Sequence, residues 1–252
     1  MSEFLYGINP VHEALTSGGR KAVELLVVSG ERNDRQEQLV KLARQRQLQV
    51  RYLDRRELDR LIGHAHHQGV LLKLEPFQYT DFDELIERWQ ATNQTGFFLL
   101  LDGITDPQNF GAVLRSAEVA GCTGVIVAKD RSCPVTPVVE KTAAGALAHI
   151  PLCRVTNLSR AMESLKARGV WCYGLAGEEG AVDLFASELT GNLALVVGSE
   201  GKGLRTNIRN HCDQLLAIPM KGRVGSLNAS VAAGIALFEV VRQSRTAPLS
   251  AD

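Results

Sequence analysis

The chain has 252 residues, and its 28 Lys and Arg balance its 28 Asp and Glu, so the net charge is zero. A neutral chain has no overall electrostatic attraction for nucleic acid, and such binding must depend on a local basic surface. No stretch approaches the roughly 20 apolar residues of a membrane-spanning helix, and the N-terminus lacks a signal-peptide pattern. The five cysteines are scattered without a CxxC pair, which predicts reduced thiols, no metal site and a cytoplasmic protein.

Residues 1–76 form a first predicted unit that alternates helices and strands. Within residues 31–60, nine Lys and Arg stand against six Asp and Glu, which indicates either a solvated helix face or an RNA-facing surface. Residues 77–96, with a polar helix at 81–90 and turn formers after it, are predicted to link two domains. The predicted helices of the first unit are 9–15, 35–47 and 55–62, and its strands are 25–29, 50–53 and 69–74.

From residue 97 to 245 strands and helices alternate regularly, which predicts an α/β domain with a mainly parallel sheet and helices on both faces. The final helix has one apolar stripe with small residues elsewhere, so it can pack on two sides, one of them a partner subunit. The tail, 246–252, is predicted to be disordered. Predicted strands are 97–101, 125–128, 150–155, 171–176, 193–197 and 215–219, and predicted helices are 109–120, 138–148, 158–168 and 227–241.

Two loops of this domain are candidates for a ligand site. Residues 198–203 and 220–228 each follow a short apolar strand, and open α/β sheets bind ligands beyond the carboxyl ends of their strands. The first loop contains Glu200 and lacks the GxxxxGK[ST] spacing of a phosphate-binding loop. A carboxylate in that place favours a ligand with cationic or hydroxyl character.

A third set of polar residues follows the first strand of the domain. Asn109 suits a helix N-cap, and Gly111 and Arg115 are four residues apart on one helix face. Glycine costs about 1 kcal/mol relative to alanine in a helix, and here it would clear space beside the guanidinium. The alternative is an ordinary salt bridge for Arg115 and, for Gly111, a role in packing the helix on the sheet.

Each remaining polar residue also has a purely structural interpretation. Glu200 could be a charge favoured by a helix dipole, and Ser226 could cap the final helix with Asn228 just inside it. Together, however, these residues would place three polar groups at three strand ends of one sheet edge. That arrangement favours a functional site over three independent structural roles.

These motifs resemble the three ordered motifs of the SPOUT superfamily of RNA methyltransferases, in its ribose 2′-O branch of SpoU/TrmH type. The resemblance extends over nearly the whole chain to about Ser244, and is closest to members that methylate guanosine in 23S ribosomal RNA. One small departure is Ala229, where valine is common. The matching segments are NxGxxxR (109–115), GSEGxG (198–203), IPM (218–220) and SLNxS (226–230), with YGINPVHEAL (6–15), HQGV (67–70) and DGITDPQNFGAVLRSA (102–117).

The resemblance implies the fold, the cofactor and the partners. SPOUT domains thread their C-terminal segment into a deep trefoil knot that binds S-adenosylmethionine, and the N-terminal unit is similar to the L30e-like RNA-binding fold. Family members are homodimers, so Asn109 and Arg115 of one subunit can meet substrate beside the other subunit's cofactor. Neither DNA nor a membrane is an expected partner. The implied cofactor-binding residues are Gly198, Gly203, Ile218, Met220 and Leu227.

The resemblance further implies methyl transfer to a guanosine ribose 2′-hydroxyl in the peptidyl-transferase loop of 23S ribosomal RNA. Arginine with a pKa above about 12 is a poor base, so Arg115 is predicted to clamp a phosphate and stabilise oxyanion charge. Proton removal by Arg115 is the less favoured option, and Glu200 is the other candidate base. The implied catalytic residues are Asn109, Arg115, Glu200, Ser226 and Asn228.

Three rival functions are compatible with parts of the sequence. A ribosome-assembly factor with a silent active site would need only the RNA-binding unit, but the motif residues are intact. A nucleotide-dependent enzyme of Rossmann or flavodoxin type would need a GxGxxG after an early strand, which the sequence lacks. An acidic glycine loop also suits neither a pyrophosphate group nor FMN. A transfer-RNA 2′-O-methyltransferase is the nearest alternative, and the N-terminal unit favours ribosomal RNA over it.

Overall fold

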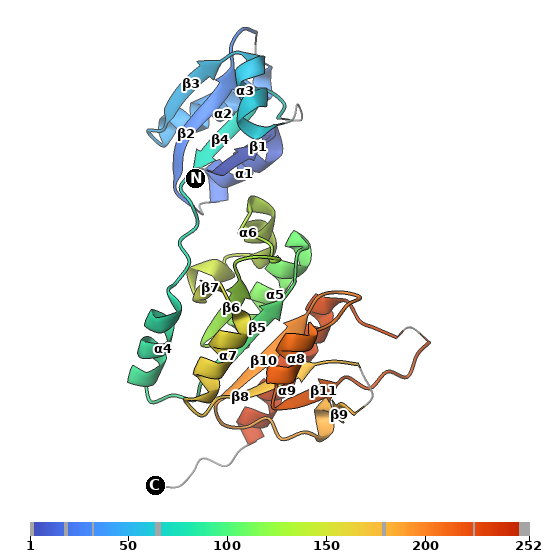
Figure 1. Ribbon diagram of the computed structural model, residues 1–252. Helices are drawn as coiled ribbons and strands as arrows, with labels where there is room; N and C mark the ends of the chain where they lie inside the picture. Colours follow the sequence, from blue (N-terminus) through green and yellow to red (C-terminus); the bar gives the residue numbers. More distant parts are fainter. Residues whose placement is uncertain are drawn as a thin grey trace. The chain divides into compact units, whose positions relative to one another are not determined.

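The structure, a computed structural model, describes residues 3–17, 20–31, 33–63, 67–177, 180–223 and 225–246. The chain forms two compact units that divide between Gln78 and Tyr79 (Figure 1). Of the tail predicted to be disordered, 246–252, Thr246 instead ends the last helix, and the rest lies outside the described residues. No helix in the described ranges is long and apolar enough to span a bilayer.

The N-terminal unit contains a four-stranded sheet in the order β1-β4-β2-β3. Strand β4 is antiparallel to both β1 and β2, whereas β3 is parallel to β2 at the edge. The prediction had omitted the first of these strands. The strands are β1 (Glu3–Tyr6), β2 (Ala22–Val28), β3 (Gln49–Leu53) and β4 (Val70–Leu74), and the helices are α1 (Ile8–Ser17), α2 (Asp34–Gln45) and α3 (Arg55–Ile62).

Both faces of this sheet are covered because β2 is apolar on both sides. Leu25 and Val27 point into the larger core with α1 and α2, whereas Leu26 points into a smaller core with Leu58 of α3. Side chains alternate between the two faces of a strand, so a continuous apolar run supplies both cores. Helix α3 ends at Gly63, whose φ of 72° favours glycine.

The second unit contains a seven-stranded sheet in the order β7-β6-β5-β10-β8-β11-β9 (Figure 1). Every paired neighbour is parallel, which confirms the predicted α/β class. The short edge strand β9 was not predicted. The strands are β5 (Phe97–Asp102), β6 (Gly124–Ala128), β7 (Leu152–Val155), β8 (Trp171–Leu175), β9 (Val182–Asp183), β10 (Leu193–Gly198) and β11 (Gln214–Ala217).

Helices pack on both faces of this sheet, as the strand–helix alternation predicted. Helices α4, α7 and α8 bury their apolar residues against one face, with Phe98 and Leu100 of β5 in the same core. Helices α5 and α9 contact each other, and they bury residues such as Phe110 and Leu237. The helices are α4 (Phe82–Ala91), α5 (Pro107–Val119), α6 (Pro137–Ala143), α7 (Leu158–Lys166), α8 (Thr206–His211) and α9 (Ala229–Thr246), with short 3₁₀ helices η1 (Ala146–Ala148) and η2 (Leu184–Ala186).

The segment predicted as a linker, 77–96, is for the most part a piece of the second unit. Its helix α4 is capped by Asp81, and Leu85, Ile86 and Trp89 lie buried in the core with β5. The Trp89 ring meets Phe98 edge-on at 5.2 Å between centroids. The polar residues of α4 suggested a linker, whereas its three buried side chains make it a packed helix.

The helix predicted at 138–148 is interrupted. Helix α6 ends at Ala143, and Ala144 and Gly145 both adopt positive φ, at 49° and 92°. The chain then forms η1. Gly145 within this segment was the available sign of the break, because glycine is a poor helix former and readily adopts positive φ.

The sheet has a topological switch between its two central strands, β5 and β10. Strands β6 and β7, which follow β5 in the chain, lie on one side of β5. Strands β8 and β11 lie on the opposite side, beyond β10. Ligands of open α/β sheets bind where the strand order reverses in this way. The loops after β5 and β10 therefore lie at the expected position of a ligand site.

Candidate functional site

Asn109 lies in the first turn of α5, directly beyond β5. The predicted N-cap role is wrong, because Asp106 caps the helix by accepting the Asn109 backbone N–H at 2.7 Å. Pro107 occupies the first helical turn, where a missing N–H costs nothing. Asn109 is therefore the third residue of the helix, within its first turn, and its side chain is available for other contacts.

Glu200 lies at the tip of a tight loop that follows β10. The loop closes through two backbone hydrogen bonds, from Ser199 N to Gly203 O at 3.1 Å and from Gly203 N to Ser199 O at 2.9 Å. Gly201 and Gly203 adopt φ of 79° and 63°, which glycine tolerates best. A Cβ on Gly198 would lie 2.2 Å from the Gly203 carbonyl carbon, so the strand and the returning loop need this glycine.

Asn228, and not Ser226, caps the final helix. Its side-chain oxygen accepts the backbone N–H groups of Ser230 at 2.9 Å and Val231 at 3.4 Å, and α9 begins at Ala229. The predicted start at 227 is therefore two residues early. Ser226 is exposed in the preceding loop, and its side chain makes no hydrogen bond with the described residues.

Three predicted site residues form one hydrogen-bonded chain at the switch point. Asn228 Nδ2 donates to Asn109 Oδ1 at 2.9 Å, and Asn109 Nδ2 donates to Glu200 Oε2 at 3.1 Å. They come from three segments, the loop before α9, the start of α5 and the loop after β10. The predicted convergence of Asn109, Glu200 and Asn228 at one sheet edge is present in the structure.

Backbone N–H groups at the start of α9 determine which side-chain atoms donate and which accept along these hydrogen bonds. Because Ser230 N–H can only donate, the atom of Asn228 that faces it must be the amide oxygen, which leaves Nδ2 for Asn109. Asn109 must then present its oxygen to Asn228 and its Nδ2 to Glu200. Glu200 Oε2 is therefore held as a hydrogen-bond acceptor.

Arg115 lies apart from this chain of residues. It is exposed on α5, and its guanidinium has no hydrogen bond or ion pair with the described residues. It lies six positions after Asn109, which places the two about 120° apart around the helix. Within one polypeptide, the fold thus brings Asn109, Glu200 and Asn228 together, whereas Arg115 lies on another face of α5.

Gly111 does not clear space for Arg115, as the sequence had suggested. A Cβ at this position would lie 2.6 Å from Thr142 Cβ and 2.8 Å from Val139 O, both in α6. The glycine therefore allows close contact between α5 and α6. The alternative role of Gly111, packing of the helix on the sheet, is also wrong in its partner, because the close contact is with helix α6.

The implied cofactor-binding residues occupy two neighbouring loops at the same edge. Gly198 is buried at the end of β10, and Gly203 is exposed where the first loop returns. Beyond β11, Ile218 and Leu227 are half-buried and Met220 is 42% exposed. Irregular backbone and accessible apolar side chains together provide hydrogen-bonding groups and an apolar surface.

Sequence reasoning missed an ion pair at the base of the site. Asp102 ends β5 and is 1% exposed, and its carboxylate accepts Arg205 Nε at 2.6 Å and Arg205 N at 2.9 Å. A carboxylate at the end of the otherwise apolar strand FFLLLD was the available signal. Buried charges in proteins are paired, but the sequence did not reveal which residue pairs with Asp102.

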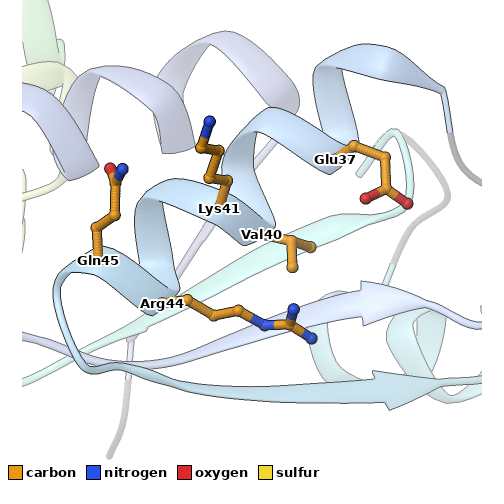
Figure 2. A pocket seen from close by; sticks show the side chains of 5 residues that line it. All are labelled: Glu37, Val40, Lys41, Arg44 and Gln45. Carbon is orange, nitrogen blue, oxygen red and sulfur yellow. The ribbon is translucent and has the colours of Figure 1, made fainter.

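Two hollows open in the N-terminal unit. One, of about 390 Å³, is lined by residues of α2 alone, as Figure 2 shows. The other, of about 690 Å³, lies at the carboxyl end of β2 and the N-terminus of α2, and its lining includes Asn33, Gln36, Arg55 and Gln68. Both belong to the unit whose basic segment indicated a possible RNA-facing surface. The residues that line the first are Glu37, Val40, Lys41, Arg44 and Gln45.

Two protein-family models match the chain. The model described as the SpoU rRNA Methylase family matches residues 96–238, more than half of the chain. The model described as RNA 2'-O ribose methyltransferase substrate binding matches residues 4–80. The two matches correspond to the two compact units of the structure.

Similar proteins carry consistent names. A 23S rRNA (guanosine-2'-O-)-methyltransferase RlmB from Haemophilus influenzae is 42% identical over 247 residues, which covers 96% of this chain and 98% of that protein. The protein of the same name from Escherichia coli is 43% identical over 246 residues, with coverage of 96% and 99%.

Solved structures show the same fold. The SpoU methyltransferase AviRb from Streptomyces viridochromogenes, in complex with AdoMet, has a TM-score of 0.64 at 27% identity and covers 97% of this chain and 91% of that chain. An AdoMet-bound rRNA methyltransferase from Sinorhizobium meliloti has a TM-score of 0.64 at 25% identity, with coverage of 96% and 87%.

Proposed function

The chain belongs to the SpoU rRNA methylase family, and we propose that it methylates the ribose 2′-hydroxyl of a guanosine in 23S ribosomal RNA with S-adenosylmethionine as donor. Relatives at 42–43% identity over 96% of the chain support this substrate. The observation that carries the proposal is the hydrogen-bonded chain from Asn228 through Asn109 to Glu200 at the topological switch point. We place the guanosine in the peptidyl-transferase loop and the protein in the cytoplasm, as the family resemblance implies.

The residues at this edge fit S-adenosylmethionine. Gly198 lacks the Cβ that would collide with the returning loop, so the backbone at Gly203 and Leu204 can pack directly against the end of β10. Ile218, Met220 and Leu227 offer a partly exposed apolar surface for an adenine ring. The cofactor, when bound, supplies a methyl group on a positively charged sulfonium.

The ribose hydroxyl is weakly acidic, so the protein must accept its proton or stabilise the alkoxide that develops. Glu200 Oε2 accepts a hydrogen bond from Asn109, which orients the carboxylate. Glu200 Oε1 then accepts the proton of the ribose 2′-hydroxyl as the 2′-oxygen takes up the methyl group. Asn109 and Asn228 hold this carboxylate in place, and Ser226 orients the ribose or the cofactor from the adjacent loop.

We assign Arg115 to the site of a partner subunit in a homodimer. Its helix face also carries Val119, which is 63% exposed, and the adjoining helix α9 exposes Val231 and Phe238 at 48% each. An apolar face of this kind suits burial against a second copy of the chain. Arg115 would then clamp the RNA phosphate and stabilise oxyanion charge next to the partner's Glu200.

The path of the C-terminal segment supports a trefoil knot. Strand β11 lies beyond β8, two strands away from β10, whereas Asn228 bonds to Asn109 of α5 and α9 contacts β10. Residues 218–228 must therefore cross back over the ends of β8 and β10. Threading of this crossing through the loop after β10 would produce the knot that the family resemblance implies.

The N-terminal unit, 1–78, is proposed as an L30e-like RNA-binding domain beside a catalytic domain that starts at residue 79. Its larger hollow presents amide and guanidinium groups of Asn33, Gln68 and Arg55. Such groups donate hydrogen bonds to phosphate and to the acceptor edges of bases. The match to a substrate-binding family model over residues 4–80 supports the role.

The test is methyl transfer from labelled S-adenosylmethionine to unmodified 23S ribosomal RNA, with total transfer RNA in parallel and the product mapped by ribose-methylation sequencing. We expect one 2′-O-methylguanosine in the 23S RNA. Transfer to transfer RNA alone would overturn the substrate while keeping the chemistry. RNA binding without any transfer would favour a silent assembly factor.

A further inference from the structure

The loop that carries Glu200 is closed at its far end by an ion pair to the neighbouring strand. Asp102 is fully buried, and Arg205 approaches it with its backbone N–H at 2.9 Å, its Nε at 2.6 Å and its Nη2 at 2.6 Å. Both carboxylate oxygens are used, Oδ2 by the backbone and Oδ1 by the guanidinium. Charge-assisted hydrogen bonds of this kind are short and strong, and they define geometry.

Asp102 also lies beside the near end of the same loop. It is the register partner of Gly198, the residue from which the chain leaves β10. The chain turns through Ser199–Gly203 and returns to Asp102 at Arg205. The loop thus begins and ends at one buried carboxylate.

The same carboxylate stands at the root of the loop that leads to Asn109. Gly103 follows Asp102 with a φ of 83°, and a Cβ there would lie 3.5 Å from Ser199 Cβ, so the two loops contact each other. Their tips then meet where Asn109 Nδ2 donates to Glu200 Oε2. Asp102 is therefore the fixed point from which both loops extend.

We propose that Asp102 and Arg205 are positioning residues that hold Glu200 in reach of Asn109 and of the ribose hydroxyl. This inference rests on the proposed methyl transfer, in which Glu200 faces the substrate. Arg205 acts through Glu200 and needs no contact with RNA or cofactor. Displacement of a catalytic group by about 1 Å can cost about 100-fold in rate, so loss of the Asp102–Arg205 ion pair should lower kcat. The same loss leaves a buried carboxylate without its cation and therefore also lowers stability, which is why the test includes Arg205→Lys.

The test is a double-mutant cycle on the full chain with Arg205→Ala, Glu200→Gln and the double variant. We expect Arg205→Ala to lower kcat at least about tenfold, and to lower it less than about twofold further in the Glu200→Gln background. Arg205→Lys, which keeps the charge, should recover part of the rate. A purely structural role would give the same factor in both backgrounds and would overturn the inference.

A second measurement needs no turnover. Hydrogen exchange of the amides from Glu200 to Gly203 should accelerate at least about tenfold in Arg205→Ala while the β5 and β10 amides stay protected. Lys166→Ala, which removes the 2.7 Å ion pair to Asp213 in the same unit, is the matched control and should leave that loop unchanged. Uniform acceleration, or none, would contradict the proposal.

The two proposals fail in different ways. If the unsubstituted chain transfers no methyl group to RNA, the proposed function is wrong, and exchange still tests whether Arg205 orders the loop. If the unsubstituted chain is active and Arg205→Ala retains its kcat, the inference about Arg205 is wrong and the function stands.

Discussion

Asn228 joins two helices of the catalytic unit, because its side-chain oxygen caps α9 and its side-chain nitrogen donates to Asn109 of α5. The oxygen and the nitrogen of this side-chain amide thus have separate roles. The oxygen stabilises the helix start, and the nitrogen sets the orientation of Asn109 and through it the orientation of Glu200.

Asn228→Asp should separate these roles. Aspartate caps as well as asparagine, so the free energy of unfolding should stay within about 0.5 kcal/mol of the parent value. Asn109 must then turn its Nδ2 toward residue 228 and its oxygen toward Glu200, and kcat should fall about 100-fold. Urea unfolding and initial rates measure the two effects, with Asn228→Ala as the variant that loses the cap as well, at about 1 kcal/mol. A parental rate in Asn228→Asp would refute the assigned directions of these hydrogen bonds.

Subunit mixing tests whether Arg115 works across a dimer. Arg115→Ala and Asn109→Ala should each abolish turnover while cofactor binding, measured by calorimetry, stays largely intact. If Arg115 completes the partner's site, random exchange of the two inactive proteins should restore about a quarter of the parental activity, since half of the dimers then have one complete site.

No recovery after verified subunit exchange would place Arg115 in its own chain's site. Near-parental activity of Arg115→Ala by itself would remove the residue from the mechanism. Monomeric protein at the concentrations of the assay would contradict the homodimer directly.

Gly198→Ala should damage the loop that carries Glu200. The new methyl carbon would lie within 2.4 Å of three backbone atoms of Gly203 and Leu204, and backbone cannot move aside as a flexible side chain can. We expect a loss of about 3 kcal/mol or more in the free energy of unfolding, with weaker cofactor binding. Gly177→Ala, which meets no atom within 4 Å, is the control and should change stability by less than about 0.5 kcal/mol.

The buried thiols predict a loss of stability at alkaline pH. Burial raises the pKa of Cys153, Cys172 and Cys212 from the ordinary value of 9.0 to about 12. The folded state therefore keeps protons that the unfolded state releases above pH 9, so stability is complete below pH 9 and falls as pH rises toward 12. Urea unfolding at pH 8 and pH 10 measures the change, and Cys172→Ala should reduce the slope.

Thiol reactivity gives an independent check of the same burial. At pH 8 the folded protein should react slowly with a disulfide reagent, because the thiolate is the reactive form, whereas unfolded protein should react fully. Rapid reaction of all five cysteines in the folded protein would contradict the burial of these side chains.

RNA affinity should depend steeply on salt despite the zero net charge of the chain. If Arg55 in the larger hollow contacts a phosphate, Arg55→Ala should reduce the slope of log affinity against log salt by about one. Arg168→Ala, whose guanidinium donates to Ser164 in the other unit, is the matched control. A salt-independent affinity would rule out a phosphate-dominated interface.

Much of the fold followed from the local pattern of the sequence. Apolar runs at 97–101 and 193–197 predicted buried parallel strands, each observed one residue longer, and a glycine-containing loop was predicted after the second of them. Local patterns failed where packing decided the outcome. The polar helix α4 buries three side chains against the sheet, and Gly111 serves contact between two helices.

The sequence by itself determined the α/β class and the identity of the polar residues at the switch point, since strand period, turn chemistry and motif spacing are local properties. Only the tertiary structure decided which of these residues meet. Asn109 and Asn228 are separated by 119 positions, and Asp102 and Arg205 by 103. Their contacts depend on β10 inserting between β5 and β8, and no local pattern specifies the order of strands in a sheet.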